Sequence, residues 1–194
     1  MKIAADIDID LANRDQVLQL IQYTAASQRK NDQLTRHNSG VYVTDIPKDT
    51  LHGYASIDYQ QAEQRGYFKI DLLNNSVYQL IRDQQHYDDM LTRTPPWARL
   101  LDRDFVGKIV HINNAWDQLQ RMPEPVDTLA RMAMFIAVIR PAKRYLQGRP
   151  WAEVAQHVWD PELDGYYFKK SHSIAYAHLV ALHMNLVQSL DQGN

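Results

Sequence analysis

The chain has 194 residues, a length that fits one domain or a compact domain with a lobe. Its formal net charge is −2 and its pI is near 6.4, which disfavours a protein that only coats DNA phosphates. It contains no cysteine, which excludes disulfides and thiolate metal sites. No apolar run approaches membrane-spanning length, and the first residues lack the basic segment and apolar core of a signal peptide, so we expect a soluble, cytoplasmic protein without membrane partners.

The first predicted element is a β-strand over residues 3–11, in which apolar and acidic residues alternate. Successive side chains of a strand point to opposite faces, so Asp6, Asp8 and Asp10 share one face. Carboxylates on one ridge repel each other unless a cation compensates them, and Mg²⁺ is usually held by one or two carboxylates plus substrate phosphates. The alternative is an amphipathic edge strand with an acidic solvent face, although strands are depleted in aspartate.

The chain then alternates between helices and strands up to a proline pair at residues 95–96, and reads as helical afterwards. A polar stretch over residues 24–38 is ambiguous. We predict an α+β part over residues 1–92 and an all-helical lobe over residues 93–194. The other expected strands lie at 40–44 and 67–73, and the expected helical segments at 13–24, 58–65, 75–91, 97–102, 112–121, 126–139, 150–158 and 172–189.

Four stretches contain polar residues that a purely structural account does not require. The stretches are Asp6/Asp8/Asp10, Arg36–Gly40, Lys69–Asp71 and Tyr166–Ala177. Each also has a structural alternative, which is, in the same order, an acidic edge strand, a turn before a strand, a solvated strand face, and a basic start of a helix capped by Ser171.

Taken together and in this order, these stretches resemble the polymerase core of the bacterial replicative DNA polymerase III alpha subunit, the family C polymerases. The acidic strand followed by Arg14-Asp15-Gln16-Val17 is similar to the family's acidic palm motif. Thr35–Val43 is similar to a palm segment with a histidine, and Gly66–Leu73 to the strand with the third catalytic aspartate. Ile139-Arg140-Pro141 and Phe168–Ala177 resemble two fingers motifs.

The resemblance implies a polymerase-beta-like palm sheet with helices, followed by a fingers-like lobe. It implies a DNA-directed DNA polymerase that uses two Mg²⁺ ions, with Mn²⁺ as a substitute, held by Asp8, Asp10 and Asp71. We therefore predict that the strands at 3–11 and 67–73 are neighbours in one sheet. The nucleotide-binding residues that the resemblance implies are Lys69, His37, Arg140, Lys169, Lys170, Ser171 and His172.

Between Arg140 and Trp151 the chain has four basic residues, no acidic residue, and aromatic residues among them. This composition suits a DNA backbone with stacked bases, and makes Lys143, Arg144 and Arg149 candidate DNA-binding residues. The alternative is a solvated helix face. A histidine zinc site is not favoured, because His178 and His183 stand five apart and do not share a helix face.

Two functions remain open. Family members are several times longer, and their glycine-serine phosphate motif is missing here, with only Thr24–Ser27 in that interval. The first function is a minimal polymerase of the kind a phage genome carries, which would work in the host cytoplasm on primer-template DNA and dNTPs, with other replication proteins supplying the missing domains. The second is a non-catalytic DNA-binding accessory protein. The acidic residues favour the first and the small size favours the second.

Overall fold

The computed structural model describes residues 7–161 and 168–193, so Asp6, Tyr166 and Tyr167 lie outside the described residues. The contacts divide the chain into two units, Met1–Gln79 and Leu80–Asn194. The first is a mixed α+β unit and the second is helical. The composition placed the boundary after residue 92, whereas helix α3 (Gln84–Thr92) packs on the last helix and belongs to the second unit.

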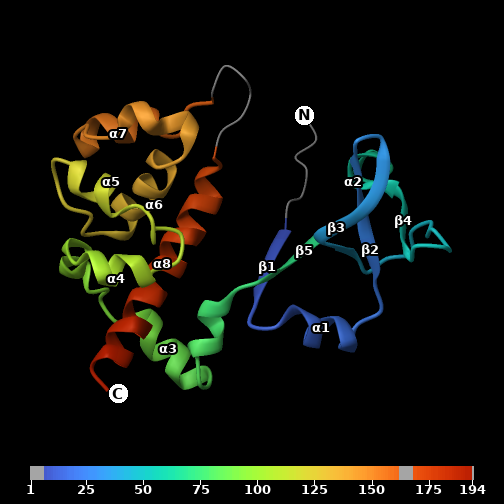
Figure 1. The fold of residues 1–194 in the computed structure, drawn as a ribbon, viewed down its shortest axis with the longest axis horizontal. Helices are drawn as coiled ribbons and strands as arrows, with labels where there is room; N and C mark the ends of the chain where they lie inside the picture. The colour runs from blue at the N-terminus through green and yellow to red at the C-terminus, as the bar shows by residue number, and fades with distance from the viewer. Residues whose placement is uncertain (1–6, 162–167, 194) are drawn as a thin grey trace. The chain divides into compact units, whose positions relative to one another are not determined.

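The first unit is built on a five-stranded mixed sheet with the order β1-β5-β3-β2-β4 (Figure 1). The pairs β1/β5 and β2/β4 are parallel, and the pairs β2/β3 and β3/β5 are antiparallel. The strand containing Asp8 and the strand containing Asp71 are therefore neighbours, which confirms the predicted pairing. The strands are β1 (Ile7–Leu11), β2 (Thr24–Lys30), β3 (Gln33–Tyr42), β4 (Tyr54–Asp58) and β5 (Ile70–Asn74).

The ambiguous polar stretch forms a hairpin of β2 and β3. Its turn is made by Asn31 and Asp32, with φ angles of 49° and 61°. Left-handed backbone at both turn positions matches the right-handed twist of the flanking strands, and Asn and Asp tolerate it better than most residues. Strand β4 was not predicted, because its central residues Ala55 and Ser56 give only a short apolar signal.

One helix packs on each face of the sheet. Helix α1 (Arg14–Leu20) begins after Asn13, whose side chain accepts hydrogen bonds from the backbone N–H groups of its first turn, and it buries Leu18 against Val41 and Leu72. Helix α2 (Tyr59–Gln64) instead packs against the neighbouring residue Tyr42 through Ala62. Adjacent strand residues face opposite ways, so the two helices lie on opposite faces.

The core of the helical unit lies between α6 (Leu129–Val138) and α8 (Lys170–Asp191), which are packed side by side. The predicted helix over residues 75–91 is in fact a 3-10 helix, η1, and the separate helix α3. No helix in the residues that the structure describes is long and apolar enough to cross a membrane. The remaining elements are η1 (Ser76–Leu80), η2 (Trp97–Leu101), α4 (Arg103–Lys108), α5 (Trp116–Arg121), η3 (Pro141–Leu146) and α7 (Trp151–His157).

Candidate functional site

Three predicted carboxylates share one face of the sheet. In the parallel register of β1 and β5, Asp8 is paired with Asp71, and Asp10 is paired with Leu73. Paired residues on neighbouring strands point to the same face, and such strands lie about 4.8 Å apart. Asp8 is exposed on the edge strand, whereas Asp71 is 8 % exposed. The sheet therefore brings Asp8, Asp10 and Asp71 onto one ridge at its β1 edge.

The Asp71 carboxylate is bound on both oxygens by protein donors. The Ser39 hydroxyl donates a 2.6 Å hydrogen bond to Oδ1, and the Lys69 ammonium forms an ion pair with Oδ2. Burial by itself raises the pKa of Asp71, but the hydrogen bonds from Lys69 and Ser39 outweigh it and hold the pKa below its ordinary value. Asp71 is thus an ionised carboxylate in a partly buried position.

His37 is neutral, with its proton on Nε2. Its Nδ1 atom accepts hydrogen bonds from the backbone N–H of Gly40 at 2.9 Å and of Ser39 at 3.3 Å, so it cannot itself carry a proton. Nδ1 lies 3.7 Å from Asp71 Oδ1, but two atoms that both accept do not form an ion pair. Burial and the nearby Lys69 charge lower the pKa of His37, which agrees with the neutral ring.

An irregularity in β3 places these groups. The four residues His37 to Gly40 lie opposite the single residue Ala26 of β2, so the strand bulges at this point. Bulges re-aim side chains and are common beside active sites. The Tyr59 ring on α2 lies beside these groups, with its centroid 5.5 Å from the His37 ring and 5.7 Å from the Lys69 ammonium. We call His37, Ser39, Lys69 and Asp71 the Asp71 cluster.

Sequence reasoning named His37, Lys69 and Asp71 but missed Ser39 and Tyr59. Ser39 stands in a stretch that the sequence singled out, but its contact with Asp71 depends on the bulge, so the strand pattern gave no signal for it. Nothing in the local sequence marks Tyr59, because α2 brings it to the cluster through tertiary packing.

The carboxylate face suits Mg²⁺ in its chemistry, since Mg²⁺ takes oxygen ligands. As the side chains are placed, no group of three His, Asp or Glu residues within 7–161 and 168–193 is arranged to hold a metal ion. Two of the carboxylates are already engaged: Asp71 is bound to Ser39 and Lys69, and Asp10 Oδ2 accepts from Asn75 at 3.1 Å. A metal ion shared by these aspartates therefore requires Lys69 to leave Asp71.

The predicted DNA-binding residues of the helical unit differ in their placement. Lys143 is only 2 % exposed, and its ammonium donates to the backbone carbonyls of His157 at 3.1 Å and Asp160 at 2.7 Å. It anchors the end of α7, so we remove it from the DNA-binding set. Arg149 pairs with Glu153 at 3.7 Å, and Arg144 is exposed. The sequence did not reveal this difference because all three residues look alike in a basic run.

The predicted fingers residues lie around the start of α8. Lys169 occupies the N-cap position but its side chain does not cap the helix, and Ser171 lies inside the first turn, so the expected Ser171 cap is wrong. Ser173 contacts the core instead, donating to the Ala133 carbonyl at 2.5 Å. Ile174, in the same turns of the helix, is 42 % exposed.

Stacked side chains connect the start of α8 with Arg140. The Arg140 guanidinium lies 4.9 Å from the Phe168 ring centroid, and Phe168 stacks on Tyr176 at 5.8 Å. The His172 ring is 6.4 Å from Tyr176, and the Lys170 ammonium lies 5.9 Å from the Trp159 ring. The helical unit therefore gathers three of the predicted nucleotide-binding side chains around one helix end.

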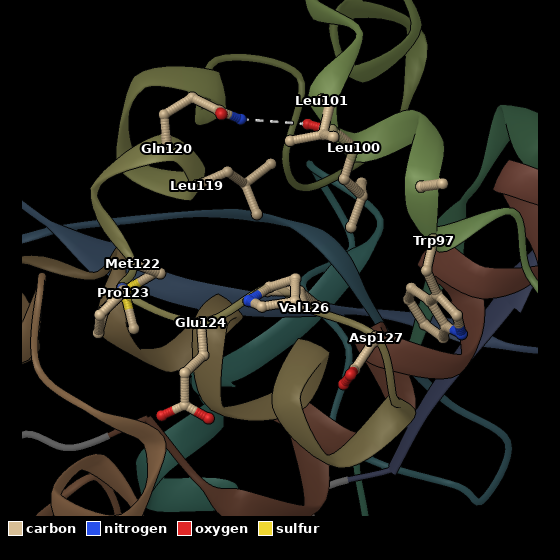
Figure 2. A pocket seen from close by; sticks show the side chains of 12 residues that line it. Trp97, Leu100, Leu101, Leu119, Gln120, Met122, Pro123, Glu124, Val126 and Asp127 are labelled. Atoms are coloured by element: carbon tan, nitrogen blue, oxygen red, sulfur yellow. Dashed lines mark hydrogen bonds between the residues drawn. The ribbon is translucent and has the colours of Figure 1, made fainter.

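A separate pocket of about 520 Å³ opens between η2, α5 and the loop after α5 (Figure 2). Its wall is mostly apolar and includes Trp97. The polar side chains of the lining are engaged: Gln120 donates to the Leu100 carbonyl at 3.3 Å, while Glu124 and Asp127 both pair with Arg131. The pocket therefore offers no distinctive polar chemistry for a ligand.

Comparison with known proteins adds no relative: no family model, no curated protein and no solved structure matches the chain.

Proposed function

We propose that the chain is a minimal DNA-directed DNA polymerase of the family C type, or the catalytic core of one, which transfers dNMP to a primer 3′-hydroxyl. The observation that supports this proposal best is the register of β1 and β5. It sets Asp8 beside Asp71, with Asp10 further along the same ridge and Lys69 on Asp71. An acidic edge strand without function would not need the third carboxylate on the neighbouring strand.

In this proposal Asp8, Asp10 and Asp71 hold two Mg²⁺ ions, for which Mn²⁺ can substitute. When bound, the ions lower the pKa of the attacking hydroxyl and neutralise charge on the leaving pyrophosphate. The protein positions the nucleotide with donors on the same cluster: the Lys69 ammonium and the Nε2–H of neutral His37. Arg140, Lys169, Lys170, Ser171 and His172 are the corresponding nucleotide-binding candidates of the helical unit.

The second candidate function is a non-catalytic DNA-binding accessory protein of a replication complex. One observation favours it: the charge of Asp71 is already balanced by Lys69 and its other oxygen accepts from Ser39, as in a structural carboxylate. Under this alternative the aspartates have no metal-dependent role. Exposed Arg144 would still contact DNA phosphates.

Primer extension and DNA binding separate the two functions. The wild-type chain is incubated with primer-template DNA, four dNTPs and Mg²⁺, beside Asp8→Asn and the control Asp15→Asn, whose carboxylate lies in the first turn of α1. Extension by the wild type and the control, but not by Asp8→Asn, supports the polymerase. Binding of DNA by all three proteins without extension supports the accessory protein.

A further inference from the structure

The two donors that hold Asp71 differ in mobility. Ser39 belongs to β3, which is hydrogen-bonded to β5 through the pairing of Gly40 with Asp71, and its short side chain fixes Oδ1. Lys69 precedes β5 and reaches Oδ2 at the end of a flexible four-carbon stem. The lysine ammonium can therefore move away from the carboxylate without a change in the sheet, whereas the Ser39 hydroxyl can only rotate about its short side chain.

Asp71 needs a cation beside it at all times. Its side chain is 11 % exposed and that of Lys69 is 19 % exposed, so the pair is largely removed from water. A carboxylate in such a place is costly without a positive partner. Lys69 and a divalent metal ion cannot both contact Oδ2, because two cations at that distance repel each other strongly in a partly buried site.

Lys69 packs against a glycine and an aromatic ring. Gly40 has no side chain against the lysine stem, and the Tyr59 ring lies 5.7 Å from the ammonium. A triphosphate offers several charged oxygens, which bind an ammonium at least as well as one carboxylate does. Phosphates near the Asp71 cluster would therefore take Lys69 from Asp71.

We propose that Lys69 is an exchangeable counter-ion of Asp71, and that Asp71 becomes a metal ligand only when the phosphates of a bound nucleoside triphosphate draw Lys69 away. The inference rests on the proposed function and adds the order in which the site is loaded. Nucleotide and metal then strengthen each other's binding by the same factor, as linkage requires. Without nucleotide, the chain therefore binds divalent metal ions only weakly.

The test measures Mn²⁺ binding by electron paramagnetic resonance, with and without the substitution-inert complex of Rh(III) with dATP. That complex supplies phosphates and keeps its own metal, so the bound Mn²⁺ reports on the protein carboxylates. The proteins are the wild type, Lys69→Met, Lys69→Arg and Arg14→Met. Arg14→Met is the matched control: it removes one positive charge near the cluster from a side chain that donates to the Ser39 carbonyl at 3.4 Å.

We expect Lys69→Met alone to bind Mn²⁺ about tenfold or more tightly than the wild type alone, the effect of losing one charge-assisted contact. The Rh(III) complex should tighten Mn²⁺ binding to the wild type by a similar factor and to Lys69→Met hardly at all. Lys69→Arg and Arg14→Met should stay within about threefold of the wild type, since neither frees Asp71. Thermal melts verify folding, and Lys69→Gln replaces Lys69→Met if the latter does not fold.

Two other results are informative. Equal Mn²⁺ affinity in the wild type and Lys69→Met, independent of the Rh(III) complex, would overturn the counter-ion role while leaving the polymerase proposal intact. Failure of all four proteins to bind Mn²⁺ under both conditions would overturn the polymerase proposal and the counter-ion role together.

Discussion

A Cβ atom on Gly40 would lie 2.8 Å from Lys69 Cδ and 3.0 Å from Ala26 Cβ. The first distance is shorter than real contacts of a Cβ atom and the second is very tight, so a side chain at position 40 would force the lysine stem to shift. Gly40 also donates its backbone N–H to His37 Nδ1. One residue without a side chain thus allows Lys69 to reach Asp71 and fixes the proton position of His37.

Gly40→Ala should therefore displace Lys69 from Asp71 and destabilise the first unit. Overpacking of a tight position costs about 1–3 kcal/mol, which a chemical denaturation curve detects.

Gly107→Ala is the matched control for this substitution. Gly107 lies in α4, and a Cβ there would meet no atom within 4 Å. Alanine in a helix should leave the stability unchanged or raise it by up to about 1 kcal/mol. Equal effects of the two substitutions would contradict the role of Gly40.

The neutral state of His37 predicts a pH dependence of stability. Its pKa in the folded chain lies below the ordinary value of 6.5, chiefly because of burial. The unfolded chain then takes up the proton more readily, so the stabilising contribution is complete above pH 6.5 and is lost as the pH falls below it. Denaturation at pH 7.5 and pH 5.5 should show a larger loss for the wild type than for His37→Gln.

A site-resolved measurement keeps this effect apart from that of His183, whose pKa burial also lowers. Long-range ¹⁵N–¹H NMR should show His37 with a bare Nδ1 and a protonated Nε2 at pH 7.5. A His37 ring that titrates at or above pH 6.5, or that has the proton on Nδ1, would contradict the hydrogen-bond assignment.

Lys143 and Arg144 are adjacent in sequence but should behave oppositely. Lys143→Met removes the ammonium that donates to the carbonyls of His157 and Asp160, of which that of His157 keeps a 3.2 Å hydrogen bond from the Asp160 backbone N–H, and should lower stability by about 1–3 kcal/mol. Arg144→Met removes an exposed charge and should hardly change stability. If the chain binds DNA through this run, Arg144→Met should reduce the slope of log affinity against log salt by about one.

Measurements of DNA affinity at two salt concentrations, beside thermal melts, compare the two variants. A stable Lys143→Met protein with a reduced salt slope would mean that the lysine is not the buried anchor described above.

The strand pattern predicted part of this site, and its limits have physical causes. The alternation of side chains placed Asp8 and Asp71 on the faces of two identifiable strands, and the resemblance to the family palm predicted that these strands are neighbours. The hairpin of β2 and β3 was not predicted, since its side chains are polar on both faces and give no hydrophobic period. The contact between Ser39 and Asp71 depends on the bulge in β3, which no local sequence pattern predicts.

The sequence also did not show which charged side chains are buried. Lys143 lies in a run that reads as a basic surface, and only the fold turns it toward the end of α7. The cap of α8 was misassigned for a related reason. Serine is a favoured cap, but here Ser173 is the serine that contacts a neighbouring helix, and the backbone begins the helix one residue before Ser171.

The most direct test of the proposed function is the addition of a single nucleotide to a labelled primer, with Mg²⁺ and one dNTP at a time. We predict that the wild type adds the nucleotide that pairs with the template. Asp71→Asn should lower the rate by about a thousandfold, the equivalent of several kcal/mol of metal stabilisation, while Asp15→Asn retains it. Addition by Asp71→Asn at the wild-type rate, or no addition by the wild type with Mg²⁺ or Mn²⁺, would contradict the proposal.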